Sequence, residues 1–236
     1  MLINSNNVWI TSDTHYNHSN ICKVTTNWNE DKLAEDHAGC RSFESLESMN
    51  SEIVYQINKN VKKNDYLFHL GDWSFGGIES IFEFRKSINC SNVHLILGNH
   101  DHHIRNNRLL PDEQQEEASH YLRNKLSIKI KDVTTQDLFS SVQEVLQIKV
   151  QKSRAFKAIP IFLSHYSHRV WDKHYKGYLH AFGHSHGSLE YAPNGKSTDV
   201  GIDTAYKRYG EYRPYHIHEF IDIVEKQHLN IIDQHE

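Results

Sequence analysis

The chain has few cysteines, no Gly/Ser/Pro-rich stretch and no long apolar run. Its three cysteines, Cys22, Cys40 and Cys90, are odd in number and widely spaced, which argues against a disulfide framework and favours a reducing compartment. The longest apolar stretches, such as residues 159–163, are far shorter than the roughly 20 residues that span a bilayer. Residues 1–8 lack the basic and apolar segments of a signal peptide. These absences predict a cytoplasmic protein without a membrane span.

The sequence also lacks a basic excess. Its 26 lysines and arginines stand against 30 acidic residues, and the net charge is −4. A protein that binds long nucleic acid usually carries a basic stripe, and none is evident here. This balance favours a small or locally gripped substrate, and it counts against a nuclease on polymeric nucleic acid unless an insertion supplies a basic groove. The sequence leaves the oligomeric state open.

Histidine, in contrast, is abundant, with 19 among 236 residues. Imidazole is the commonest metal ligand and titrates near neutrality, so this excess indicates a metal site or a pH-dependent role. Hydrophobic residues make up 38% of the sequence and aromatic residues 11%, enough for a packed core. Because no linker separates two apolar patterns, residues 1–236 are predicted to form a single domain.

Three short apolar runs, residues 8–12, 66–70 and 93–97, have the length and composition of buried strands. They lead into Asp13-Thr14-His15, Gly71-Asp72 and Gly98-Asn99-His100-Asp101, respectively. Parallel strands place their carboxyl ends together, so these polar side chains are expected at one shared edge of a sheet.

Helical patterns separate these strands. Apolar residues recur at helical spacing within residues 49–61 and again within 78–88. The resulting β-α-β-α-β order predicts a parallel sheet with right-handed crossovers. Residues 104–140 show the least pattern, although Pro111 followed by Asp112 resembles a first helical turn, and we expect a helical insertion or cap there.

The last third of the chain is predicted to form a second sheet packed on the first. Its expected strands are residues 145–150, 159–164, 178–182 and 198–202. Asn194-Gly195 is a hairpin signal before the last of them. Residues 215–220 also alternate like a strand, and His216 and His218 there are interpreted as structural.

Single motifs decide little in a chain so rich in histidine, because chance alone gives roughly one or two His-x-His pairs. The ordered series is more specific, since five fragments each follow a predicted strand. They are Asp13-x-His15, Gly71-Asp72, Gly98-Asn99-His100-Asp101, Ser164-His165 and Gly183-His184-Ser185-His186.

This series resembles the D-x-H, G-D, G-N-H-D, H and G-H-x-H blocks of the calcineurin-like metallophosphoesterase superfamily, and no ligand of the pattern is missing. Residues 12–21 and Asp199-Val200-Gly201-Ile202-Asp203 resemble, more narrowly, a group of small bacterial and phage members of uncertain substrate. Residues 104–157 are longer than expected in that group. The resemblance implies an α/β fold in which two packed mixed β-sheets are flanked by helices, the αββα sandwich of the metallophosphatases.

The resemblance also implies a centre with two divalent metal ions. Asp72 would bridge them, because a shared carboxylate offsets the repulsion between cations about 3.5 to 4 Å apart. The remaining protein ligands would be Asp13, His15 and His186 for one ion and Asn99, His165 and His184 for the other. Nitrogen and oxygen ligands without sulfur suit transition metals, with Mn²⁺ expected in assays and Fe, Zn²⁺, Co²⁺ or Ni²⁺ as alternatives.

By the same resemblance, a hydroxide that bridges the two metals attacks phosphorus in line, His100 protonates the leaving oxygen and Asp101 orients His100. Two cations, two aspartates and a hydroxide leave a charge of about +1, which attracts a phosphate group. His18, His168 and Arg169 are candidates for contact with the substrate. Each of them is also compatible with an ordinary surface position that has no role in binding.

The function expected from these observations is hydrolysis of phosphate esters on a small phosphorylated substrate, with phosphodiesters of nucleotides or of short nucleic-acid ends preferred. Three alternatives stay open. They are a phosphomonoesterase on a small metabolite or protein, a nuclease on polymeric nucleic acid, and a non-catalytic interaction module on the same fold.

Overall fold

The computed structural model describes residues 1–22, 40–189 and 195–228. Its strands are β1 (Leu2–Asn4), β2 (Val8–Thr11), β3 (Tyr66–His69), β4 (Asn92–Ile96), β5 (Ser141–Gln143), β6 (Val145–Gln151), β7 (Ile159–Ser164), β8 (Leu179–Phe182), β9 (Ser197–Asp199) and β10 (Tyr215–His216). Its α-helices are α1 (Leu46–Asn60), α2 (Ile78–Ser87), α3 (His102–Arg105), α4 (Asp112–Tyr121), α5 (Ile202–Tyr209) and α6 (Ile217–Val224). A π-helical turn, η4 (Leu122–Leu126), continues α4.

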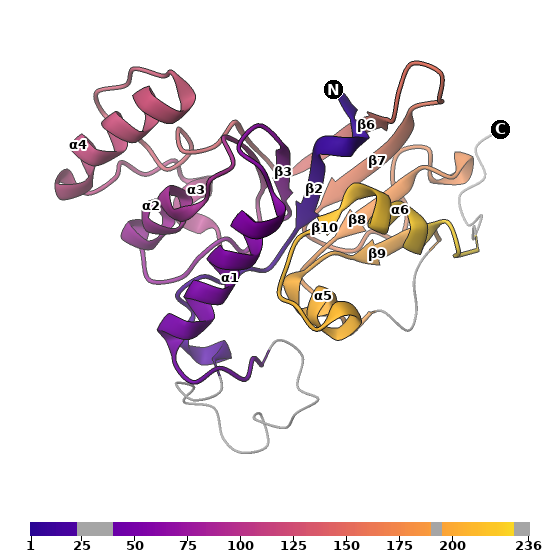
Figure 1. Cartoon of the computed structure of the whole chain (residues 1–236), viewed down its shortest axis with the longest axis horizontal. Coiled ribbons are helices and arrows are strands. Elements are labelled where there is room, and N and C mark those ends of the chain that lie inside the picture. Colours follow the sequence, from indigo (N-terminus) through magenta and orange to yellow (C-terminus); the bar gives the residue numbers. More distant parts are fainter. Residues whose placement is uncertain (23–39, 190–194, 229–236) are drawn as a thin grey trace.

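The strands form two mixed sheets, as predicted, with five strands in each among the described residues. The first sheet has the order β10-β2-β3-β4-β5, and all its neighbours are parallel except the β10 and β2 pair. The second has the order β1-β6-β7-β8-β9, in which only β6 and β7 are antiparallel. The predicted unit β2-α1-β3-α2-β4 is confirmed. Helices flank the two sheets in the manner of the metallophosphatase sandwich (Figure 1).

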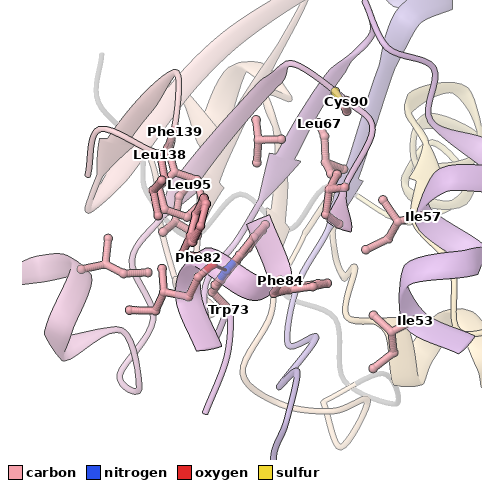
Figure 2. Close-up of a cluster of buried hydrophobic side chains, with 14 of the residues drawn as sticks. Ile53, Ile57, Leu67, Trp73, Phe82, Phe84, Cys90, Leu95, Leu138 and Phe139 are labelled. Carbon is pink, nitrogen blue, oxygen red and sulfur yellow. Dashed lines mark hydrogen bonds between the residues drawn. The ribbon is translucent and has the colours of Figure 1, made fainter. Parts of the chain in front are cut away.

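Two apolar cores hold these layers together. Along β3 and β4 the side chains alternate, so Leu67 and Leu95 face α1 and α2 while Phe68 and Ile96 face the second sheet. Trp73 lies at the centre of the helix-side core (Figure 2). Burial of apolar side chains on both faces explains why these strands read as continuous apolar runs in the sequence.

Helix α1 shows how local signals fix an element. Ser45 and Ser48 cap its amino end through reciprocal hydrogen bonds of 3.0 Å between the side chain of each and the backbone N–H of the other. Ile53 and Ile57 are fully buried one helical turn apart and pack in the helix-side core (Figure 2). The amino-terminal cap fixes where α1 begins, and its buried apolar side chains pack the helix against the first sheet.

The insertion between β4 and β5 contains α3, α4 and η4. Helix α4 begins at Asp112, directly after Pro111. Its residue Gln114 donates to the backbone carbonyl of Glu79 at 3.3 Å, which ties α4 to α2. Figure 1 shows α4 at the end of the molecule, beyond α2. That the chain forms a single domain stays a prediction, and among the described residues no helix is both long and apolar enough to cross a membrane.

Two expected strands are shorter than predicted. The strand expected over 198–202 ends at Asp199, because the Asp199 carboxylate accepts a hydrogen bond from Gly201 N at 2.7 Å and α5 begins at Ile202. The strand expected over 215–220 ends at His216, where Glu219 accepts from His216 N at 2.8 Å and caps α6. A side-chain cap thus overrides the alternating pattern. The hairpin predicted around residue 194 lies outside the described residues.

Candidate metal centre

The polar residues that follow the parallel strands meet at one edge of the two sheets, as the strand order predicts. The loop after β2 pairs with the loop after β3, because Asp13 N donates to Gly71 O and His15 N donates to Asp72 O, both at 3.0 Å. The second sheet joins them through His165 Nδ1, which lies 2.7 Å from Leu70 O. Five separate segments therefore contribute to one site.

A first group of potential ligands consists of Asp13, His15 and His186. His15 Nε2 lies 3.8 Å from Asp13 Oδ1, and His186 Nε2 lies 4.0 Å from the same oxygen. Asp13 Oδ1 and His15 Nε2 are buried and have no hydrogen-bond partner. These separations are too long for hydrogen bonds, but two ligands about 2.1 Å from one ion at a tetrahedral angle lie about 3.4 Å apart. The first group therefore fits a metal cation.

A second group consists of Asp72, His165 and His184, with Asn99 beside it. Because a backbone carbonyl can only accept, His165 Nδ1 carries the proton that is donated to Leu70 O. His165 Nε2 then presents a lone pair, 3.0 Å from Asn99 Oδ1 and 3.6 Å from Asp72 Oδ2. Several electron-pair donors face one another here without a proton between them, which is an arrangement that a cation stabilises.

Asp72 lies between the two groups. Its Oδ2 is 3.5 Å from His15 Nε2 of the first group and 3.6 Å from His165 Nε2 of the second. Its Oδ1 accepts a hydrogen bond from His100 N at 2.9 Å, which fixes the carboxylate. Burial and the nearby Asp13 charge raise the pKa of Asp72 to about 8 in the metal-free chain. A second buried carboxylate at this position needs positive charge to be ionised at neutral pH.

The backbone at the site is strained. Five of the seven predicted ligands adopt the left-handed conformation, with φ values of 55° for Asp13, 47° for His15, 56° for Asp72, 65° for His184 and 46° for His186. Non-glycine residues rarely adopt it, and each such residue costs on the order of 1–3 kcal/mol. The fold maintains all five at one edge, which is typical of a functional site.

Glycines in the motifs allow the loops to approach closely. A Cβ on Gly98 would lie 2.2 Å from Asp72 Oδ1, and a Cβ on Gly183 would lie 2.4 Å from Asp13 Oδ2. No side chain fits at either position without displacing a ligand carboxylate. The glycines of the Gly98-Asn99 and Gly183-His184 fragments therefore serve the packing of the metal loops.

Comparison with known proteins agrees with this geometry. The family model for calcineurin-like phosphoesterases matches residues 7–191. The chain belongs to the calcineurin-like phosphoesterase family. This family consists of metal-dependent hydrolases that act on phosphate esters, and the two groups of ligands are where this phosphoesterase would hold divalent metal ions.

One solved structure has a similar fold. The crystal structure of the protein of unknown function AQ665 from Aquifex aeolicus is 17% identical, with a TM-score of 0.50, and the match covers 92% of this chain and 98% of that one. At this identity the likeness concerns the fold alone. No curated protein matches the sequence significantly.

The phosphoesterase supports its first ligand group with residues that were not singled out as site residues in the sequence. Asp203 Oδ2 lies 2.6 Å from His186 Nδ1, and Arg41 donates to both Asp203 oxygens at 2.8 and 2.9 Å. Arg41 Nη2 also donates to Asp13 O at 2.6 Å. Burial alone would lower the pKa of His186, but the hydrogen bond and charge of Asp203 raise it to about 9.

This arrangement fixes the orientation of His186, since Asp203 can only accept and Nε2 is left to face Asp13. The Asp199-to-Asp203 fragment, quoted above for the resemblance, was a usable signal for Asp203. Nothing in the sequence around Arg41 marks it, because its role depends on distant contacts alone.

Asp101 forms hydrogen bonds to the backbone at the site. Its buried carboxylate accepts hydrogen bonds from Gly98 N at 2.8 Å, Asp72 N at 2.9 Å and Trp73 N at 3.0 Å. The ring of His100 is not among its hydrogen-bond partners. Asp101 therefore joins the loops that carry Asp72 and Asn99, and its orientation of His100 stays a prediction.

His100 stands at the open side of the centre. Its side chain is 43% exposed, and its Nε2 lies 4.0 Å from Asp72 Oδ2. Burial lowers its pKa below the usual histidine value.

His18 lies on the same open side of the centre. Its ring stacks on Phe75 with a centroid distance of 3.6 Å, and its Nδ1 lies 3.3 Å from His15 Nδ1. Phe75 was not singled out in the sequence, because it belongs to no motif.

The other two candidates for substrate contact lie differently. The ring of His168 packs edge-on against Phe162 and His180 of the second sheet, at centroid distances of 5.2 and 5.7 Å. This places the ring of His168 against β7 and β8. Arg169 follows it and is exposed, and a role for Arg169 in substrate binding stays a prediction.

Proposed function

We propose that this phosphoesterase hydrolyses phosphate esters at a centre of two divalent metal ions, with phosphodiesters of nucleotides or short nucleic-acid ends as preferred substrates. The observation that carries the proposal is the position of Asp72 Oδ2, almost equidistant from His15 Nε2 at 3.5 Å and His165 Nε2 at 3.6 Å. One carboxylate oxygen facing a ligand of each group is the arrangement that a bridging ligand requires.

The two ligand groups then divide the ions between them. Asp13, His15 and His186 would hold the first ion, and Asn99, His165 and His184 the second, with Asp72 shared by both. Imidazole, carboxylate and amide ligands favour transition metals over Mg²⁺ or Ca²⁺. We propose Mn²⁺ as the ion for assays, with Fe, Zn²⁺, Co²⁺ and Ni²⁺ as the other metals that this set accepts.

Such an ion pair supplies a water molecule that is deprotonated near neutral pH and positive charge that stabilises the phosphoryl oxygens. The side chains of the protein position the substrate and transfer protons. His100 is the exposed imidazole nearest to Asp72, and we propose that it donates a proton to the leaving oxygen. The Phe75 and His18 stack borders the same side and would limit the approach of solvent.

A small cavity of about 80 Å³ lies beside this open side, between the loop of residues 74–77 and the start of α3. Its volume corresponds to two or three water molecules at roughly 30 Å³ each, which is room for one compact group of a substrate. Phe75, His100 and His102 are among its lining residues. It supports a substrate that extends past the reacting phosphate, as a diester does.

The reaction class is tested by assays on p-nitrophenyl phosphate and bis-p-nitrophenyl phosphate with Mn²⁺ and with EDTA. We expect metal-dependent turnover of the bis ester above that of the monoester, and about two transition-metal ions per chain after loading. The matched control is Asp222→Asn, which changes an exposed carboxylate of α6. Failure of the chain to bind metal after reloading, together with no turnover of either ester or of a nucleotide panel, would favour a non-catalytic module instead.

A further inference from the structure

A large basic hollow lies far from the metal ligands. It has a volume of about 720 Å³ and lies between the end of α1 and the end of α4 with η4. Its lining includes Lys62, Lys63 and Lys125, and we call it the lysine groove. Asn58, Asn89 and Asn124 also line it, so the groove presents three ammonium groups and three amides.

The three lysines have no carboxylate partner among the described residues. None forms a salt bridge there, whereas Lys59 and Lys86 nearby are paired with Glu211 and Glu117. The Lys125 amine donates only to a backbone carbonyl, that of Ile88. Burial together with the charges of Arg85 and Lys63 lowers the pKa of Lys125 to about 8. The groove therefore concentrates positive charge that the protein does not neutralise.

The positive charge is local to the groove and to the segment after α4. Residues 118–131 contain four basic residues and no acidic one, whereas α4 before them carries Asp112, Glu113, Glu116 and Glu117. A second hollow of about 610 Å³ is lined by Arg123, Lys129 and Lys131 together with Glu116. The lysine groove is therefore the part of this region that lacks a carboxylate in its lining.

The lysine groove and the metal ligands lie at opposite ends of the same strands. Lys62 and Lys63 precede β3 and Asn89 precedes β4, whereas Asp72 and Asn99 follow them. From Lys63 to Asp72 the chain runs nine residues and from Asn89 to Asn99 ten, which at about 3.3 Å per residue separates the two places by up to roughly 30 Å. One nucleotide cannot reach both, but a nucleic-acid strand of about nine nucleotides, at about 3.4 Å each, spans that length.

We propose that the lysine groove binds the sugar-phosphate backbone of a nucleic-acid strand whose phosphodiester lies at the metal centre. The inference rests on the proposed function and narrows its substrate class to an oligonucleotide or longer strand. Ammonium groups contact backbone phosphates and release bound counterions, while amide side chains hydrogen-bond to sugars and phosphates. The expectation that long nucleic acid is disfavoured rests on the summed charge of the chain, whereas this proposal rests on the local charge of the lysine groove.

The test is direct binding, which does not depend on turnover. Fluorescence anisotropy would follow a labelled phosphorothioate single strand of about 12 nucleotides, which keeps the backbone charge and resists hydrolysis, added to the full chain as purified. The variant K62Q/K63Q/K125Q is compared with K152Q/K157Q/K176Q, which removes the same charge from exposed positions elsewhere. The double variant K62Q/K63Q, which changes only exposed side chains, covers the case in which Lys125→Gln disturbs folding.

We expect the groove variant to bind at least about 10-fold more weakly at low salt and to lower the slope of log K against log salt by about two, since each single-strand phosphate contact contributes about 0.7. The control variant should bind like the wild-type chain. Turnover of bis-p-nitrophenyl phosphate, which is too small to reach the groove, should be unchanged in all variants.

Three results would overturn the inference: no binding of the strand by the wild-type chain, equal losses in the groove and control variants, or groove-dependent binding of a nucleoside triphosphate without binding of the strand. The last would make the groove a nucleotide site. Because binding is measured without turnover, a chain that binds the strand but hydrolyses no ester would refute the proposed function and not the groove.

Discussion

The two ligand groups of the metal centre differ in how firmly the fold holds them. In the first group, Asp13 and His15 are buried, and the side chain of His186 is 18% exposed and fixed by Asp203. Asp203 is in turn held by the buried side chain of Arg41. In the second group, Asp72 and His165 are buried, but His184 and Asn99 are exposed.

This difference indicates that the first group would bind its metal ion tightly, whereas the second group would expose its metal ion to the substrate. A first group with a buried supporting network is organised before the ion arrives, so we expect a tightly bound and slowly exchanging ion there. The second group has an open side, next to His100, and we expect its ion to exchange faster and to meet the substrate. The predictions below test that division.

The strongest test is Asp72→Ala, because Asp72 is the one carboxylate that faces both groups. Without it, neither of the proposed ions would keep a full set of ligands, and the two cations would repel each other unscreened. We expect loss of both ions, measured by metal analysis after gel filtration, and activity at the uncatalysed background. Retention of two ions by the variant would mean that Asp72 does not bridge them, and that the two groups bind their ions without a shared ligand.

His100→Ala should separate chemistry from metal binding. The side chain lies on the open side, with its Nε2 4.0 Å from Asp72 Oδ2, so we expect unchanged metal content. Loss of a general acid should slow hydrolysis about 10²- to 10⁴-fold on esters with poor leaving groups. The p-nitrophenyl esters, whose leaving group needs little protonation, should be affected much less. An equal loss on both kinds of substrate would argue that His100 acts by position or charge.

Asp203→Asn should weaken the first group alone. The variant keeps the shape of the side chain but offers one accepting oxygen instead of two and no negative charge, so it cannot balance Arg41 and holds His186 less firmly. We expect the affinity for the more tightly bound ion to fall about 10- to 100-fold, measured by competition with a chelator, while the second ion is unaffected. Asp222→Asn on the exposed face of α6 is the control. Equal weakening of both ions would erase the difference between the groups.

The sequence predicted the two mixed sheets and the shared edge of the first three strands for a physical reason. Buried parallel strands read as short apolar runs, and their polar ends must share an edge, so Asp13, Asp72 and Asn99 were found from local patterns. Local patterns failed at residues 200–202 and 217–220, where contacts from Asp199 and Glu219 to the backbone start helices. The alternating pattern of apolar and polar side chains at these positions does not indicate that such hydrogen bonds form.

The supporting residues of the site were harder to predict. Arg41 and Asp203 are 162 positions apart and meet only in the folded chain. The bonds of Asp101 were not predicted for a related reason, since its motif suggests a partner in sequence, His100, while its three hydrogen bonds go to backbone amides of two loops. Ligands follow from the chemistry of side chains, but the groups that orient them follow from tertiary packing.

Acid should weaken the supports of both groups alike, with a smaller effect that is measured on stability. His69 contacts Thr14 of the first group's loop at 2.8 Å, and His180 lies in β8, which leads to His184. Burial lowers the pKa of each to about 3. Below pH 6.5 the unfolded chain binds a proton that the folded chain excludes, so stability falls with acid between about pH 6.5 and 3 and is unaffected above that window.

Each of these two histidines should contribute about 1.4 kcal/mol per pH unit within the window. Urea unfolding of the EDTA-treated chain at several pH values measures the slope, and EDTA removes the effect of protons competing with metal. His180→Gln should reduce the slope by about one proton, whereas His120→Gln, at an exposed position of α4, should not. If His180→Gln leaves the slope unchanged, then its ring is already charged in the folded chain, and β8 does not depend on a neutral imidazole.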